Sequence, residues 1–159
     1  MHLYIVRHTE AEYYSNPESG ERELSAEGKQ ILNAVAPKWL NFIKKPDAIV
    51  SSPIHRALET AKIIKECIGF GQEIDIQSIF DGTGTIDDWT SYLNSLDSDN
   101  ILVVSHEPSC SQYLSMYISH FTAEIVYKPA TISGITFTGR IRKHSGSLLF
   151  TVPPDVLLK

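Results

Sequence analysis

Two patterns of apolar residues take turns along the chain, and they predict strands and helices in alternation. Short runs rich in β-branched and aromatic residues predict strands at 3–6, 47–51, 73–79, 101–105, 132–137 and 148–152. Apolar residues recurring every three or four positions predict helices at 25–43, 53–68, 85–96 and 108–118. Run 101–105 is apolar on both faces, as buried parallel strands are. The alternation predicts an α/β fold, a three-layer α/β/α sandwich around a mostly parallel sheet.

Turn and cap residues set the expected limits of these elements. Ser25 and Thr85 stand where N-caps belong. Pro37 lacks a backbone donor, so we expect it to kink or split the first helix. The polar segment 12–23 is expected to form a loop over the strand ends, and segment 120–129 shows no clear pattern.

Length, composition and charge narrow the class of protein. The 159 residues fit one domain spanning 1–159, and 42% apolar with 21% charged residues is typical of a soluble globular chain. A net charge of -5 argues against nucleic acid or an anionic membrane as a partner. No apolar run approaches the ~20 residues of a membrane span, and no secretory signal is seen, so the expected location is the cytoplasm. Cys67 and Cys110 are expected to be small core residues.

Arginine and histidine residues follow three of the predicted strands. Arg7 and His8 end the first strand, Arg56 opens the helix after the second, and His106 ends run 101–105. The carboxyl ends of parallel strands meet at one edge, so we expect these side chains to converge. Taken singly, each also fits a solvated strand end or helix surface.

Together these four side chains suit phosphoryl chemistry. Two guanidinium groups can bind phosphate oxygens, one neutral imidazole can attack phosphorus, and a second can stabilise the equatorial oxygens. The cationic side chains then supply the charge, so no metal or other cofactor is expected.

Four segments resemble motifs of the histidine phosphatase superfamily, also called the phosphoglycerate mutase-like fold. Segment 7–10 (RHTE) is similar to its Arg-His-Gly signature, and 22–28 (RELSAEG) to its R-x-L-[ST]-x-x-G segment. Segment 51–61 (SSPIHRALETA) is similar to SSPxxRAxxTA, and 104–108 (VSHEP) to the second-histidine motif. Small size and a short Gly-containing loop before a helix with Tyr92-Leu93 resemble the SixA-type phosphohistidine phosphatases.

This resemblance implies roles for the four side chains. His8 is the expected nucleophile, and Arg7, Arg56 and His106 complete the phosphate pocket. The implied activity is a metal-independent phosphatase that forms phosphohistidine on His8 and dephosphorylates phosphohistidine on a protein. A small-molecule phosphomonoesterase acting on a phosphate ester is the alternative, and a non-catalytic phosphoprotein-binding module is a third.

Two departures from the family pattern concern Thr9 and the general acid. Thr9 replaces the usual glycine, and its hydroxyl either donates to the phosphate or is merely tolerated by the loop. Many family members carry an acidic general acid after the third strand, where this chain offers only Asp81. The other loop carboxylates, for which a solvated surface position is the ordinary expectation, are Glu10, Glu18 and Glu21. A phosphoramidate substrate fits a missing acid, because its leaving imidazole can arrive already protonated.

Overall fold

The computed structural model describes all 159 residues and contains one six-stranded sheet with the order β3-β2-β4-β1-β5-β6. The strands are β1 (His2–Arg7), β2 (Ala48–Ser51), β3 (Asp75–Ile76), β4 (Asn100–Ser105), β5 (Ile132–Thr136) and β6 (Ser147–Val152). The helices are α1 (Ala26–Trp39), α2 (His55–Cys67), α3 (Ile86–Ser95) and α4 (Ser109–Ile118), with short 3-10 turns η1 (Ser78–Phe80) and η2 (Pro154–Val156).

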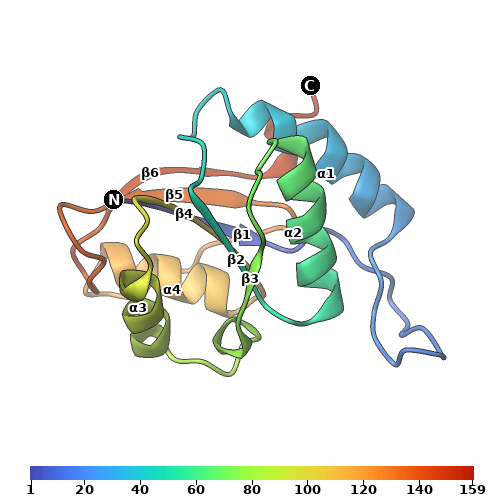
Figure 1. Ribbon diagram of the computed structural model, residues 1–159, viewed down its shortest axis with the longest axis horizontal. Coiled ribbons are helices and arrows are strands. Elements are labelled where there is room, and N and C mark those ends of the chain that lie inside the picture. Colours follow the sequence, from blue (N-terminus) through green and yellow to red (C-terminus); the bar gives the residue numbers. More distant parts are fainter.

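Helices cover both faces of the sheet, which confirms the predicted three-layer α/β/α sandwich. Helices α1 and α2 lie on one face, and α3 and α4 on the other (Figure 1). Strands β1 to β4 are parallel to one another, whereas β5 is antiparallel to β1 and β6 is antiparallel to β5 at one edge. Alternate residues of the central strands enter opposite cores. Leu102 and Val104 join the α1–α2 side, and Ile101 and Val103 join the α3–α4 side.

The register of the central strands places their carboxyl ends at one level. Arg7 pairs with Ser105 across β1 and β4, and the His8 amide donates to the Ser105 carbonyl at 3.0 Å. On the other side of β4, the Ser52 amide donates to the Val104 carbonyl at 3.1 Å. The ends of β1, β4 and β2 therefore form a single rim, as ladder pairing requires.

The expected helix starts are confirmed, and the expected split at Pro37 is wrong. The Ser25 hydroxyl accepts from the Gly28 amide, and Thr85 forms a capping box with Asp88. Pro37 lies inside α1, which continues to Trp39. The proline removes one backbone donor, but only Lys38 and Trp39 follow it in the helix.

Two further predictions differ in detail from the structure. Only Asp75 and Ile76 of the expected strand 73–79 pair with β2, because β3 is an edge strand followed by a 3-10 turn. Cys110 is fully buried, as expected, but Cys67 is only partly buried at the last position of α2. No helix has the length and apolar character that crossing a membrane requires.

Candidate active site

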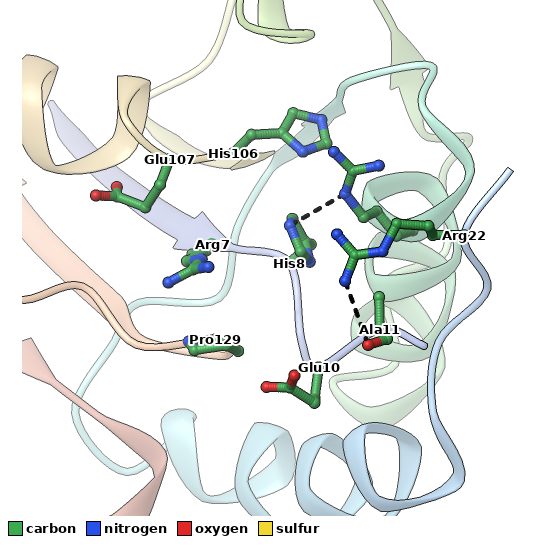
Figure 2. Close-up of a pocket in the computed structure, with 9 residues that line it drawn as sticks. Arg7, His8, Glu10, Ala11, Arg22, His106, Glu107 and Pro129 are labelled. Atoms are coloured by element: carbon green, nitrogen blue, oxygen red, sulfur yellow. Dashed lines mark hydrogen bonds between the residues drawn. The ribbon is translucent and has the colours of Figure 1, made fainter. Parts of the chain in front are cut away.

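A cavity of about 200 Å³ opens at the rim formed by the ends of β1, β4 and β2. It contains all four side chains that the sequence predicted would converge (Figure 2). The residues that line it are Arg7, His8, Glu10, Ala11, Arg22, Arg56, His106, Glu107 and Pro129. Polar and charged groups dominate this lining, as binding of a small anion requires.

The His8 ring is fixed in one tautomer by its neighbours. Its Nδ1 lies 2.7 Å from the Thr9 carbonyl oxygen, which can only accept, so Nδ1 carries the ring proton. Its Nε2 accepts a hydrogen bond from Arg56 Nε at 3.2 Å. The ring lone pair of His8 is therefore on Nε2, inside the cavity, where it accepts from a guanidinium group.

The His106 ring lies next to His8, with the two ring centroids 5.2 Å apart. Its Nε2 is 2.8 Å from the Ser52 hydroxyl, which also accepts from the Ile54 amide at 3.1 Å. The Ser52 hydroxyl can donate to Nε2 while its oxygen accepts from Ile54, and this arrangement places the ring proton on Nδ1. Nδ1 is buried and has no partner in the protein. A phosphate oxygen would supply the missing acceptor.

Burial keeps both imidazoles neutral at pH 7. It lowers the pKa of His8 from 6.5 to about 3, and the charges of His106, Arg56 and Arg7 add to the effect. It lowers the pKa of His106 to about 4, with Arg56 the next cause. Only 8% of His8 and 4% of His106 is exposed. A neutral His8 is the form that can act as a nucleophile.

Three guanidinium groups surround the imidazoles. Arg7 donates through Nη1 to the Tyr127 carbonyl at 2.6 Å, and its buried Nε has no partner. Burial lowers the pKa of Arg56, and the nearby charge of Arg22 adds to this effect. An unpartnered buried donor and adjacent like charges both fit a bound anion.

Arg22 is a pocket residue that the sequence analysis did not assign. A bridge between Ala11 and Leu24 folds the polar loop 12–23 back over the rim. Arg22 Nε donates to the Glu12 carbonyl at 2.6 Å, and Nη2 donates to the Ala11 carbonyl at 3.4 Å, as Figure 2 shows for the second bond. Its place at the start of motif 22–28 was the available signal.

Two carboxylates also line the cavity, and their surroundings differ. Glu107 accepts hydrogen bonds from the amide and the hydroxyl of Ser111, at 2.8 and 2.6 Å. The Glu10 carboxylate is exposed and forms no salt bridge. The other two loop acids considered, Glu18 and Glu21, are exposed and do not line the cavity.

Thr9 does not reach the cavity, so the expected phosphate contact is corrected. It is 1% exposed, and its hydroxyl donates to the Gly28 carbonyl at 3.0 Å. Its amide donates to the Thr60 hydroxyl at 3.2 Å. The other expectation describes Thr9 better, since the loop accommodates the side chain by turning it into the contact with α1.

Asp81 also lies outside the cavity lining. Its Oδ1 accepts from the hydroxyl and the amide of Thr83, at 2.7 and 2.9 Å. These bonds lower the pKa of Asp81, which is the opposite of what a general acid at neutral pH requires. The partly exposed His55 ring lies 3.5 Å from Glu59 and does not line the cavity.

No group of three or more His, Cys, Asp or Glu side chains is arranged to hold a metal ion. The expectation that the chemistry needs no cofactor stays a prediction.

Comparison with known proteins finds one family model that matches part of the chain. Residues 3–80 match the model described as histidine phosphatase superfamily (branch 1). No curated protein sequence matches the chain.

The fold is similar to those of several solved phosphatases. One is the protein histidine phosphatase SixA complexed with tungstate, with a TM-score of 0.81, 19% identity and 99% of each chain covered. Another is the α-ribazole phosphatase of Shigella flexneri, with a TM-score of 0.71, 16% identity and 97% of each chain covered. A third is a phosphoserine phosphatase mutant of Entamoeba histolytica in complex with phosphoserine, with a TM-score of 0.66, 18% identity and 98% of each chain covered. These likenesses support the fold.

The family match begins in β1 and ends in η1, so it includes Arg7, His8 and Arg56. The structure adds His106 from β4 to the same cavity. Just under half of the chain, residues 3–80, thus matches the histidine phosphatase superfamily, and the whole chain shares its fold with solved phosphatases.

Proposed function

We propose that this chain is a single-domain, metal-independent phosphatase that removes phosphate from phosphohistidine on a protein. The observation that carries the proposal is the tautomer of His8. Its ring proton is held by the Thr9 carbonyl, so Nε2 presents a lone pair to the cavity beside Arg56.

The first step transfers the phosphoryl group to His8. Phosphate oxygens bind Arg7, Arg56 and His106, and the Arg56 N–H moves from His8 Nε2 to a phosphate oxygen. The Nε2 lone pair then forms a bond to phosphorus while the bond to the leaving group breaks with its electron pair. The guanidinium groups stabilise the charge of the transferring group.

The second step regenerates the enzyme. Water attacks phosphorus on the phosphorylated His8, and the P–N bond breaks with its electron pair returning to Nε2. The proton lost by water passes to the released phosphate, and the Nδ1 proton stays on the ring, hydrogen-bonded to the Thr9 carbonyl oxygen. His8 therefore ends each turnover in the tautomer with which it began.

Because Asp81 does not line the cavity, phosphohistidine fits the site better than an alkyl ester does. An alkoxide must be protonated as it leaves, yet hydrogen bonds from Thr83 favour the ionised form of Asp81. A leaving imidazole with a protonated second nitrogen departs as a neutral ring and needs no acid. The fold shared with the protein histidine phosphatase SixA supports the same substrate class.

The second candidate is a small-molecule phosphomonoesterase. It is supported by the fold shared with the α-ribazole phosphatase and the phosphoserine phosphatase. The two candidates differ in the leaving group, so relative turnover of a phosphoramidate and an ester separates them.

The decisive experiment compares a phosphohistidine protein, a phosphoserine peptide and p-nitrophenyl phosphate at matched concentrations. We expect the highest kcat/KM on phosphohistidine, unchanged by EDTA and abolished in His8→Ala. Mass spectrometry after an alkaline quench should place the intermediate phosphate on His8, with His55→Ala as the matched control. Label on His106 would reverse the assigned roles. Faster hydrolysis of the esters would favour the phosphomonoesterase, and binding without any turnover would favour a binding module.

A further inference from the structure

A second hollow adjoins the phosphate cavity. It has a volume of about 180 Å³ and shares two lining residues with that cavity, Glu10 and Pro129. The other lining side chains used below are Ile31, Lys128, Pro154 and Asp155. Because Glu10 and Pro129 belong to both linings, they form the border between the two spaces, and we call the second space the border hollow.

The backbone of Glu10 is held firmly at this border. Its carbonyl accepts hydrogen bonds from the amide and the hydroxyl of Ser25, at 3.0 and 3.4 Å. Helix α1 also approaches closely here, because a Cβ atom at Gly28 would lie only 2.3 Å from the Glu10 carbonyl oxygen. The origin of the side chain is therefore fixed relative to His8, two residues earlier.

The Glu10 carboxylate is the uncompensated charge of the border hollow. Lys128 and Asp155 also line it, but they form a salt bridge with each other. Glu10 pairs with none of the three arginines of the phosphate cavity. In Figure 2 its carboxylate lies on the Pro129 side, away from the His106 wall. A free carboxylate here repels anionic leaving groups and attracts cationic ones.

We propose that the border hollow receives the leaving imidazole of a phosphohistidine, and that Glu10 accepts a hydrogen bond from the protonated ring nitrogen not bonded to phosphorus. This inference rests on the proposed function and adds the subsite that recognises the leaving group. Ile31, Pro129 and Pro154 supply apolar surface for the flat faces of the ring, and Glu10 supplies the charge.

The chemistry at Glu10 requires no net proton transfer. As His8 Nε2 bonds to phosphorus, the P–N bond of the substrate breaks and its electron pair returns to the leaving nitrogen. The imidazolium-like ring thereby becomes a neutral imidazole that keeps its proton on the nitrogen facing Glu10. An alcohol leaving group has no such N–H, so Glu10 favours phosphoramidates over esters.

Kinetics of three glutamate variants on two substrates test this assignment. The substrates are phosphohistidine, as the free amino acid, and p-nitrophenyl phosphate, whose leaving group is a phenolate. We expect Glu10→Gln to reduce kcat/KM on phosphohistidine roughly tenfold or more, as loss of a charge-assisted hydrogen bond does, and to leave or raise kcat/KM on the ester. Glu18→Gln, at an exposed position, should leave kcat/KM for both substrates unchanged.

Glu107→Gln separates a specific contact from a general effect of charge. It removes a carboxylate from the same cavity, but one held by Ser111. We expect it to change kcat/KM for both substrates in the same direction. Ile31→Trp, which fills the border hollow without altering charge, should raise KM for phosphohistidine and leave inhibition by inorganic phosphate unchanged, because Ile31 does not line the phosphate cavity.

The outcomes distinguish this inference from the proposed function. If wild-type protein does not hydrolyse phosphohistidine, both the proposed function and this inference are wrong. If it does, and Glu10→Gln affects both substrates equally or neither, the proposed function stands and the border hollow is not the leaving-group site. Loss selective for the ester in Glu10→Gln would also overturn the assignment. Thermal unfolding of each variant checks that the fold is retained.

Discussion

Arg56 Nε donates a hydrogen bond to His8 Nε2 at 3.2 Å, so a cationic donor covers the lone pair that we propose as the nucleophile. This contact holds the ring in its reactive tautomer and disfavours its protonation, because a proton on Nε2 would face a guanidinium group. It must also break when phosphate binds, since the same N–H is then needed by a phosphate oxygen. The Arg56–His8 hydrogen bond therefore belongs to the substrate-free enzyme, and substrate binding replaces it with a bond from Arg56 to phosphate.

Removing this guanidinium should impair the chemical step. We expect Arg56→Ala to lower kcat/KM by roughly 100- to 1000-fold, the usual cost of losing a donor to a transition-state anion. Steady-state assays with p-nitrophenyl phosphate measure the effect, and Arg140→Ala at an exposed loop is the matched control. A change below threefold would show that Arg56 does not contact the transferring group.

The lowered pKa values of the two histidines predict acid sensitivity of the fold. Both are neutral in the native state down to about pH 4, but the unfolded chain takes up their protons near the ordinary value of 6.5. Stability is therefore complete above pH 6.5 and is lost as pH falls towards 4, by up to about 1.4 kcal/mol per pH unit for each histidine.

Urea unfolding at pH 7.0, 5.5 and 4.5 checks this prediction. His106→Asn should reduce the steepness of the pH dependence, because asparagine takes up no proton in either state. His55→Asn, at a partly exposed ring, should leave the wild-type dependence unchanged. Equal slopes in wild type and His106→Asn would contradict the lowered pKa.

Arg22 should contribute to anion binding although the sequence analysis did not assign it. We expect Arg22→Ala to weaken inhibition by inorganic phosphate about tenfold, the usual loss for one charge-assisted hydrogen bond. Product-inhibition constants for wild type, Arg22→Ala and the control Arg140→Ala measure this. An unchanged constant would mean that Arg22 serves only to fix the loop through the Glu12 carbonyl.

Helix α1 approaches the backbone at Glu10 so closely that one added methyl group should destabilise the protein. In Gly28→Ala the new Cβ would lie 2.3 Å from the Glu10 carbonyl oxygen, so the helix or the loop must shift. We expect a loss of about 1–3 kcal/mol in the free energy of unfolding, with reduced kcat because His8 is displaced. Gly71→Ala has open space and is the matched control. Equal stability of the two variants would exclude this packing constraint.

Local pattern was sufficient to predict the sheet and helices of this fold. The apolar run of β4 and the caps at Ser25 and Thr85 act over a few neighbouring residues, so they can be recognised without tertiary contacts. Edge strand β3 was predicted too long because its pairing depends on β2, which its own sequence does not describe.

The order of residues along the chain was enough to predict which chemistry is available, because strand polarity brings guanidinium and imidazole groups to the carboxyl ends of parallel strands. What each group touches depends on tertiary packing. It turned the Thr9 hydroxyl to Gly28, brought Arg22 into the cavity and left the Glu10 carboxylate free. Those outcomes depend on how α1 and the loop 12–23 pack against the rim. Hydrogen-bond partners that are distant in the chain are set by such packing, whereas periodicity records only which face of an element is buried.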